Sequence, residues 1–532
     1  MTVKSGTLLA AVIGSAVVFV DSTVVNVALP RIGRELPSSV LGVLEGQSYV
    51  YNGYLLTLSA LLILAGALND FYGRRRVFAI GLIGFGATSV LCGLAPSLEL
   101  LVLFRVLQGA AGALLVPSSL SLITAAFQGE EQGRAFGIWA GASSATTLIG
   151  PFLGGVLVDS WSWRAAFFIN VPLVLLALWA TFAFVRESRD DAATGRFDWL
   201  GALVVALAVG GLSFGTISGQ QREWRDPIAF VVLAIGAISA IALPFLMARR
   251  AHALIPLDLF RSRNFSVTNL STFLIYGALY VGLYFTGLFM QGTLGYTAAS
   301  AGIAGVPGFL FLVLLSSRFG ALAARHGPRI FMTAGPALMT IGMLWFTRVP
   351  SSSTPWALRA GDPSSYVPPA SYFVDFLPGN LVFGFGLAMM VAPLTTALMT
   401  SVPVRNSGVA SAVNNAISRV GPQLAGALIF VAITASFYSG LHARVPGLDP
   451  SQSVVRESYA PLNPPKGCGA QPCAPDDIRR FEEPAREAST DAFHLAVLVA
   501  ASLLATGGVV NGVGIADKRP EREAAGPPAT AA

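Results

Sequence analysis

The stretch Gly66-Ala67-Leu68-Asn69-Asp70-Phe71-Tyr72-Gly73-Arg74-Arg75 decides the fold, because its pattern occurs a second time in the chain. The second copy reads Gly320-Ala321-Leu322-Ala323-Ala324-Arg325-His326-Gly327-Pro328-Arg329. The first glycine, the leucine, the second glycine and the last arginine agree at one offset of 254 residues. Each copy follows an apolar stretch, so the repeat predicts two equivalent halves.

A second pair of motifs supports this division. Gly150-Pro151 with Gly155 matches Gly421-Pro422 with Gly426, at an offset of 271 residues. Repeated helix bundles are a common plan among membrane transporters. If the apolar stretches before residue 191 and after residue 250 form the equivalent halves, the two stretches between them are an inserted pair.

The composition places the chain in a membrane. Of its 532 residues, 54% are hydrophobic and 12% charged, against about 25% charged in an ordinary soluble protein. A membrane span needs roughly 20 apolar residues. The sequence predicts fourteen such spans, and hence an all-α polytopic membrane protein, with spans near 7–30, 48–68, 77–95, 98–126, 134–158, 165–185, 199–219, 227–247, 266–291, 299–319, 330–348, 375–400, 408–436 and 491–515.

Basic residues predict the orientation, because cytoplasmic connections carry an excess of positive charge. An even number of spans puts both termini on one side. The connections on that side hold most of the basic residues, including Arg74, Arg75 and Arg76. We expect both termini in the cytoplasm and the protein in the inner or plasma membrane. The first apolar run is too long for a signal-peptide core, which predicts a retained helix.

These patterns divide the chain into four parts. We expect a six-helix bundle over 1–190, an inserted helix pair over 191–250, a second bundle over 251–515 with a long external loop at 439–490, and a cytoplasmic tail over 516–532. The role of the loop stays open. Its Cys468 and Cys473 either pair, if the loop is outside, or remain free thiols.

Asp21 is the only formal charge in the first span, within Asp21-Ser22-Thr23-Val24-Val25-Asn26-Val27-Ala28-Leu29-Pro30. A carboxylate at membrane depth is costly, by a few kcal/mol on insertion scales, and usually carries ions or protons. Arg105, in the fourth span, needs a partner if it is buried. Asp21 lies roughly 13 Å, and Arg105 roughly 10 Å, from the outer ends of their helices. The sequence therefore predicts a proton-coupling pair; the alternative is an arginine that binds backbone carbonyls.

The loop after the second span predicts a conformational latch formed by Gly66, Asp70, Gly73, Arg74 and Arg75. Its glycines allow a tight turn and close approach of helices. Asp70 can pair with arginines or with a neighbouring helix end. The alternative is that the arginines only set the topology.

The fifth span is rich in small residues and contains Gly150-Pro151-Phe152-Leu153-Gly154-Gly155. Small residues let membrane helices approach closely, and proline can kink a helix. We expect Gly150, Pro151, Gly154 and Gly155 to form a seam that seals or bends the bundle, with ordinary glycine packing as the alternative.

Together these motifs resemble the major facilitator superfamily, and more narrowly its fourteen-helix drug:H⁺ antiporter branch. The stretch Trp163–Pro172 and the stretch Ser407–Ala412, which leads to Arg419, are similar to that branch too. The resemblance covers nearly the whole chain. It implies a major facilitator fold, a protonation site at Asp21, an arginine that supports proton transfer at Arg105, and an antiporter helix at Gly150-Pro151. The chain departs from the family pattern at Phe71 and Tyr49, where a basic residue and a tryptophan are usual.

Six polar residues are candidates for lining a substrate cavity: Asn26, Gln108, Tyr276, Tyr280, Tyr284 and Arg419. The three tyrosines recur every four residues and so share one helix face. That face either lines a cavity for aromatic substrates or packs against a neighbouring helix. Arg419 is the lone charge of its span, and either binds an anion or caps backbone carbonyls.

Other classes of function lack support in the sequence. Its four histidines show no metal-ligand spacing, and it contains no nucleophile elbow, P-loop or nucleotide-binding motif. We therefore expect neither an enzyme nor an ATP-driven pump, and no cofactor, metal or nucleic acid.

We expect a monomeric, proton-coupled secondary transporter that exports amphipathic small molecules, such as drugs, antibiotics or natural products, by alternating access across the lipid bilayer. One alternative is a proton-coupled uptake symporter. Another is a non-transporting lipid-handling or sensory protein that uses the external loop. The identity and charge of the substrate and the proton stoichiometry stay open.

Overall fold

The computed structural model describes residues 1–37, 43–188, 197–221, 226–250, 253–359, 361–445, 448, 449, 452, 455, 459–462 and 481–517. They form helices, with no strand among them. The N-terminal helices are α1 (Val3–Glu35), α2 (Val43–Tyr72), α3 (Arg74–Gly93), α4 (Leu98–Ala113), α5 (Leu115–Ala126), α6 (Gly129–Ser160), α7 (Ala165–Phe168) and α8 (Asn170–Phe184).

Two helices follow, α9 (Trp199–Gln221) and α10 (Pro227–Ala248), and then the C-terminal helices begin. These are α11 (Arg263–Leu288), α12 (Ala298–His326), α13 (Arg329–Trp345), α14 (Ala370–Asp375), α15 (Leu377–Thr400), α16 (Ser407–Arg444) and α19 (Glu483–Gly514). Short turns of other helix types are η1 (Leu257–Arg261), η2 (Phe289–Leu294, a π-helix), η3 (Phe346–Arg348), η4 (Pro363–Tyr366) and η5 (Val404–Asn406).

The predicted all-α membrane fold is confirmed. Thirteen helical segments of the described residues are long and apolar enough to cross a membrane. α6, with 32 residues, coincides with the remaining predicted span. Several helices run beyond their apolar stretches. α1, for example, begins at Val3, where the side chain of Thr2 accepts a hydrogen bond from the backbone N–H of Ser5.

Two predicted spans are each built from two consecutive helices. α4 ends at Ala113 and α7 ends at Phe168, four residues before Pro117 and Pro172. A proline has no N–H to donate to the carbonyl four residues earlier, and its ring clashes with that carbonyl. Each interruption thus lies at the carbonyl that faces a proline, although α12 and α16 continue through Pro307 and Pro422.

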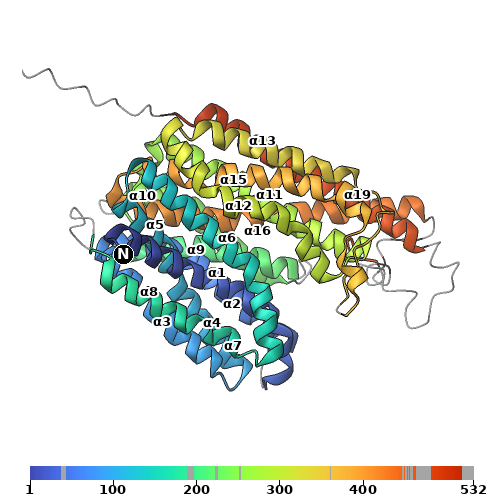
Figure 1. The fold of residues 1–532 in the computed structure, drawn as a ribbon, viewed down its shortest axis with the longest axis horizontal. Helices are drawn as coiled ribbons and strands as arrows, with labels where there is room; N and C mark the ends of the chain where they lie inside the picture. Colours follow the sequence, from blue (N-terminus) through green and yellow to red (C-terminus); the bar gives the residue numbers. More distant parts are fainter. Residues whose placement is uncertain are drawn as a thin grey trace, which may run out of the picture.

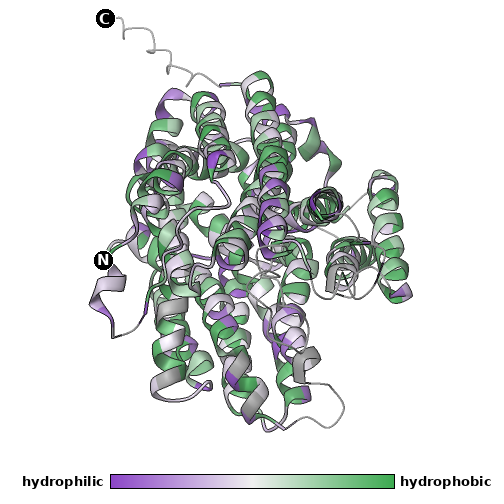
Figure 2. Ribbon diagram, turned by 90° about the vertical axis from the view of Figure 1, so that its right-hand side faces the viewer, coloured by the Kyte–Doolittle hydropathy of each residue, from purple (hydrophilic) through white to green (hydrophobic). Residues whose placement is uncertain are grey.

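The outward surface of the bundle matches a lipid environment, and Figure 2 shows apolar residues along most of the helices. α10 is the extreme case, since most of its length is exposed and apolar. Its large exposed side chains are Ile228, Phe230, Val231, Ile235, Ile238, Ile241 and Phe245. Lipid tails can cover such a face, which in water would be a liability for aggregation.

Two seams join the N-terminal helices to the C-terminal helices. α2 packs against α16, and α6 packs against α12. Figure 1 shows the two groups of long helices side by side, coloured blue to teal and yellow to red. At one end of the bundle, which we call the arginine face because Arg74, Arg75, Arg76, Arg325 and Arg329 lie there, both seams are closed by glycines.

The closed seams place backbone directly against backbone. A side chain at Gly66 would overlap the carbonyl oxygen of Gly408, and one at Gly133 would overlap that of Gly320. Ser316 adds a hydrogen bond of 3.0 Å across the second seam, to the carbonyl oxygen of Gly137. The glycines thus allow the two groups of helices to touch at the arginine face.

The sequence repeat is reproduced in the backbone. Gly73 and Gly327 both have positive φ, 107° and 94°, a conformation that L side chains rarely adopt. Each is followed by a helix whose first N–H groups are bound by a distant carboxylate. Glu187 accepts from the N–H of Arg75 at 3.1 Å, and Asp517 accepts from that of Arg329 at 3.2 Å.

Asp198 anchors the pair formed by α9 and α10. Its buried carboxylate accepts the N–H of Gly201 at 2.9 Å and so caps the start of α9. It also accepts the N–H of Leu254 at 3.2 Å and pairs with Arg250 at 2.6 Å. One side chain therefore ties the start of α9 to the segment that follows α10.

Replacing Asp198 by Ala is expected to lower the free energy of unfolding by about 1–2 kcal/mol, the effect of losing a helix N-cap. Thermal unfolding of the purified protein in detergent measures this change. Asp258→Ala is the matched control. The side chains of Asp258 and Arg261 form an ion pair but are 80% and 86% exposed, and such exposed pairs contribute little to stability. Equal effects of the two substitutions would contradict the anchoring role.

Candidate functional site

Asp21 lies at the centre of a fully buried polar cluster inside the N-terminal helices. Its Oδ2 accepts a hydrogen bond from Arg105 Nη1 at 2.5 Å. Its Oδ1 accepts two more, from Gln108 Nε2 at 3.0 Å and from Asn170 Nδ2 at 2.9 Å. These donors come from α4 and α8, so three helices converge on one carboxylate.

The guanidinium of Arg105 is held on several sides. Its Nε donates to the carbonyl oxygen of Val50 at 3.1 Å, and its Nη1 also donates to Gln108 Oε1 at 2.8 Å. The ring of Tyr54 lies against it, 4.0 Å from centroid to Cζ. A buried arginine is stabilised by such contacts, whereas removal of its carboxylate partner would leave an uncompensated charge.

The structure brings Asp21 and Arg105 together, as their similar depths suggest, and adds residues that were not singled out from the sequence. Asn170 and Ser89 are the main additions. Ser89 Oγ accepts from Gln108 at 2.7 Å and from Asn170 at 3.2 Å, so it fixes both amides. The sequence could have indicated Asn170, because it is a polar residue at the start of an otherwise apolar helix.

The other cavity candidates lie in different surroundings. Gln108 belongs to the Asp21 cluster and is fully buried, whereas Asn26 is exposed. Tyr276 is half-buried, and its ring lies 6.3 Å from that of Tyr280. Tyr280 and Tyr284 are exposed. The shared helix face of the tyrosines is thus largely open and is not packed against a neighbouring helix along its length.

Asp70 connects the two groups of helices at the arginine face. Its carboxylate accepts the N–H groups of Gly408 at 3.1 Å and of Val409 at 3.0 Å, at the start of α16. Negative charge is favourable there, because the first N–H groups of a helix lack internal partners. Arg74 pairs with Asp70 at 3.4 Å and donates to the carbonyl oxygen of Val404. Both charged residues are buried.

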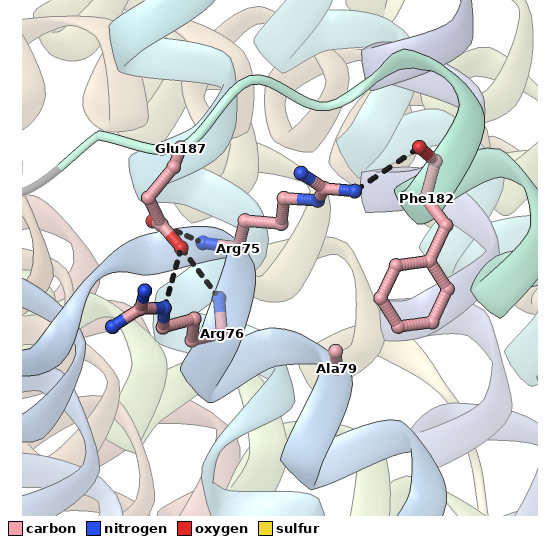
Figure 3. A pocket seen from close by; sticks show the side chains of 5 residues that line it. All are labelled: Arg75, Arg76, Ala79, Phe182 and Glu187. Carbon is pink, nitrogen blue, oxygen red and sulfur yellow. Dashed lines mark hydrogen bonds and ion pairs between the residues drawn. The ribbon is translucent and has the colours of Figure 1, made fainter.

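Arg75 and Arg76 lie on the outer side of this connection, around a small cavity shown in Figure 3. Glu187 accepts the backbone N–H groups of both arginines. Arg75 also donates to the carbonyl oxygen of Phe182 at 3.1 Å and lies over its ring. The end of α8 therefore holds the start of α3 in place.

The glycines of α6 divide between two contacts. Gly150 and Gly154 pack against Thr23 and Val24 of α1, just beyond Asp21. A side chain at Gly155 would meet nothing within 4 Å. The side chain of Pro151 lies outside the described residues, as do Cys468 and Cys473. The small-residue part of α6 thus contacts the helix that carries the buried acid.

No group of His, Cys, Asp and Glu with the geometry of a metal site occurs in the part of the chain that the structure describes.

Comparisons with known proteins show the family and the fold of this chain. Residues 11–426 match the family model of the Major Facilitator Superfamily. The chain is 33% identical to the Multidrug resistance protein Stp of Mycobacterium tuberculosis (strain CDC 1551 / Oshkosh), over 84% of this chain and 80% of that protein. It is 31% identical to the Tetracenomycin C resistance and export protein of Streptomyces glaucescens, over 87% and 83% of the two chains.

A third relative is the Methylenomycin A resistance protein of Bacillus subtilis (strain 168), at 30% identity over 81% of this chain and 89% of that protein. Among solved structures, the human organic anion transporter MFSD10 (TETRAN) is similar in fold. The TM-score is 0.55, over 94% of this chain and 98% of that chain, with 13% of residues identical.

Proposed function

This chain belongs to the Major Facilitator Superfamily, and from that premise we propose that it exports amphipathic small molecules from the cell in exchange for protons. The observation that carries this proposal is the buried Asp21–Arg105 pair with its two amide donors. The names of its relatives, which refer to drug and antibiotic resistance and to export, support the direction of transport.

Asp21 is the proton-binding group in this proposal. In its ionised form it accepts all three hydrogen bonds described above. When a proton binds, the attraction between Asp21 and Arg105 is lost, and the new O–H needs an acceptor. Asn170 Oδ1 is buried and has no partner among the described residues, so rotation of that amide can supply one. Protonation therefore rearranges contacts among α1, α4 and α8.

The latch couples this change to alternating access. We place the arginine face in the cytoplasm, because basic residues concentrate on that side of a membrane. With Asp70 bound to the start of α16 and the glycine seams closed, the two bundles, over 1–190 and 251–515, are in contact at that face. The arrangement fits a state closed to the cytoplasm, in which substrate leaves and a proton enters from outside.

The membrane potential is sufficient to drive accumulation. One elementary charge moving across 100 mV supplies roughly 2.3 kcal/mol, which corresponds to about a fifty-fold concentration ratio. An exporter that takes up one proton per substrate can therefore keep a weakly permeant compound out of the cell. No cofactor is required for such exchange.

Two alternatives predict different behaviour. An uptake symporter would carry substrate and proton in the same direction, which the named relatives do not favour. A lipid-handling or sensory protein would depend on the 439–490 loop, and its activity would survive loss of Asp21. The buried charge cluster gives neither alternative specific support.

Export from whole cells tests the proposal. Cells with and without the gene are loaded with cationic, neutral and anionic fluorescent compounds, with and without a protonophore. We expect faster efflux of some compounds from cells that carry the gene, and loss of that difference when the protonophore collapses the gradient. Efflux that persists unchanged with the protonophore would contradict proton coupling.

A further inference from the structure

Arg419 lies where α16 faces α2, between the two bundles. Gly408 and Arg419 are eleven residues apart, which is about three helical turns, so they share one face of α16. Gly408 contacts Gly66 on α2. α2 and α16 run in opposite directions, because Gly66 is near the end of one and Gly408 near the start of the other. Eleven residues back along α2 is Leu55, next to Tyr51 and Tyr54.

Arg419 has no acidic partner within the described residues of the C-terminal bundle, where the acids of α19 lie near the start of that helix. Between residues 263 and 448 the sequence contains two acids, Asp362 and Asp375, and both belong to the connection before α15. In the N-terminal bundle, Asp21 is the acid at membrane depth, and it already accepts from Arg105. The charges of Asp21 and Arg105 cancel, so Arg419 leaves a net positive charge between the bundles.

The surroundings of Arg419 are polar but uncharged. It is half-buried, and the tyrosines nearest to it, Tyr280 on α11 and Tyr54 and Tyr51 on α2, belong to helices that pack against α16. Tyr51 and Tyr280 therefore come from different bundles, and both are neutral phenols in the surroundings of Arg419. No hydrogen bond or ion pair of Arg419 occurs within the described residues. Arginine presents five N–H donors and carboxylates accept two of them at once.

We propose that Arg419, together with the hydroxyl groups of Tyr51 and Tyr280, binds an acidic group of the exported compound, so that the substrates are amphipathic anions with an apolar, aromatic body. The open face of Tyr276, Tyr280 and Tyr284 supplies aromatic surface beside the charge. This inference rests on the proposed export function and specifies its substrate class. Outward movement of an anion and inward movement of a proton are both favoured by a potential that is negative inside.

The two charged sites share one aromatic side chain. The ring of Tyr54 covers the guanidinium of Arg105 at 4.0 Å, while its hydroxyl donates to the carbonyl oxygen of Val18 at 3.3 Å. Tyr54 is also one of the tyrosines near Arg419. A movement of Arg105 on protonation of Asp21 would therefore displace the wall of the Arg419 site. This contact offers a physical route between proton binding and substrate binding.

Binding of a matched acid and amide to the purified protein tests this proposal. The probes are 1-naphthylacetate and 1-naphthylacetamide at pH 7.5, where the acid is ionised, with affinity measured by calorimetry. Wild-type protein is expected to bind the acid about ten-fold or more tightly than the amide, as for a hydrogen bond between charged groups. Arg419→Gln should remove this preference without changing the affinity for the amide, whereas Arg419→Lys should keep part of it.

Arg318→Gln serves as the control, because Arg318 is an exposed arginine on α12 outside the site, and it should leave both affinities unchanged. Equal affinity of wild-type protein for acid and amide, binding of neither, or equal weakening of both by Arg419→Gln would overturn the proposal. If neutral compounds are still exported in exchange for protons, the anion inference alone has failed. If the acid is preferred but export is independent of protons, the proposed function has failed instead.

Discussion

Replacing Asp21 by Asn is expected to abolish proton-coupled export, down to the level of cells without the gene, while the protein still inserts and folds with a lower thermal stability, because Arg105 loses its compensating charge. Asparagine has nearly the same shape and keeps an acceptor for Arg105, but it cannot exchange a proton. The substitution also removes the negative charge that compensates Arg105 at 2.5 Å. Transport is measured in energised everted vesicles, and folding by the amount of protein and its thermal unfolding.

Asp362→Asn is the matched control for charge, because Asp362 is an exposed acid in the connection before α15. It is expected to leave export unchanged. Undiminished, protonophore-sensitive export by the Asp21→Asn variant would mean that the proton binds elsewhere, and the role of the buried cluster would be structural only.

Replacing Gly66 by Val is expected to slow export strongly, because it opposes closure at the arginine face. The added side chain would overlap the backbone of Gly408 and the Cβ of Ala412, and backbone atoms cannot move aside as a flexible side chain can. Overpacking of this kind costs about 1–3 kcal/mol, which lowers the population of the closed state roughly 5- to 150-fold. Gly287→Val is the control, since a Cβ there meets nothing within 4 Å.

Labelling from the cytoplasm measures how far the seam opens at the arginine face, in protein whose thermal unfolding shows that it is folded. A single cysteine replaces Ser411, which is buried on α16 near the seam, and the native cysteines are replaced by serine. We expect a membrane-impermeant maleimide to label this cysteine much faster in the Gly66→Val protein than in the parent. Equal labelling, together with normal export, would contradict the assignment of Gly66 to the latch.

The sequence was sufficient to predict the all-α membrane fold, because this fold follows from long apolar stretches that can be recognised in the sequence alone. Apolar stretches long enough to cross a membrane predicted the spans. The repeat of Gly66–Arg75 at Gly320–Arg329 predicted two equivalent halves, and the division of the chain at 190 and 250 stays a prediction. The same repeat appears in the backbone as positive φ at Gly73 and Gly327. The helix interruptions at Ala113 and Phe168 were missed, although a proline follows each of them by four residues.

The site was only partly predictable, because depth along a helix does not define the direction in which a side chain points. The depths of Asp21 and Arg105 agreed, and the two residues are in contact. Gln108 was assigned to a substrate cavity, but it points into the Asp21 cluster, where Asn170 completes the set of donors. Rotation about the helix axis depends on packing with neighbouring helices, which the sequence pattern alone does not define.

The two carboxylates that bind the helix starts after the repeated loops could not be predicted from the sequence pattern either. Glu187 and Asp517 each follow the last helix of one half and bind the helix after Gly73 or Gly327. Neither residue belongs to a motif, and their separation in the sequence differs from the 254-residue offset of the repeat. Only the fold makes their equivalence visible.

Proton movement through the reconstituted protein is the most direct test of the claim that Asp21 exchanges a proton for substrate. Proteoliposomes loaded with a pH-sensitive dye and an acidic buffer receive an exported compound on the outside. We predict that the compound releases protons from liposomes that contain the wild-type protein and releases none from those with Asp21→Asn. Equal proton release by both proteins, or proton entry together with the compound, would contradict the account.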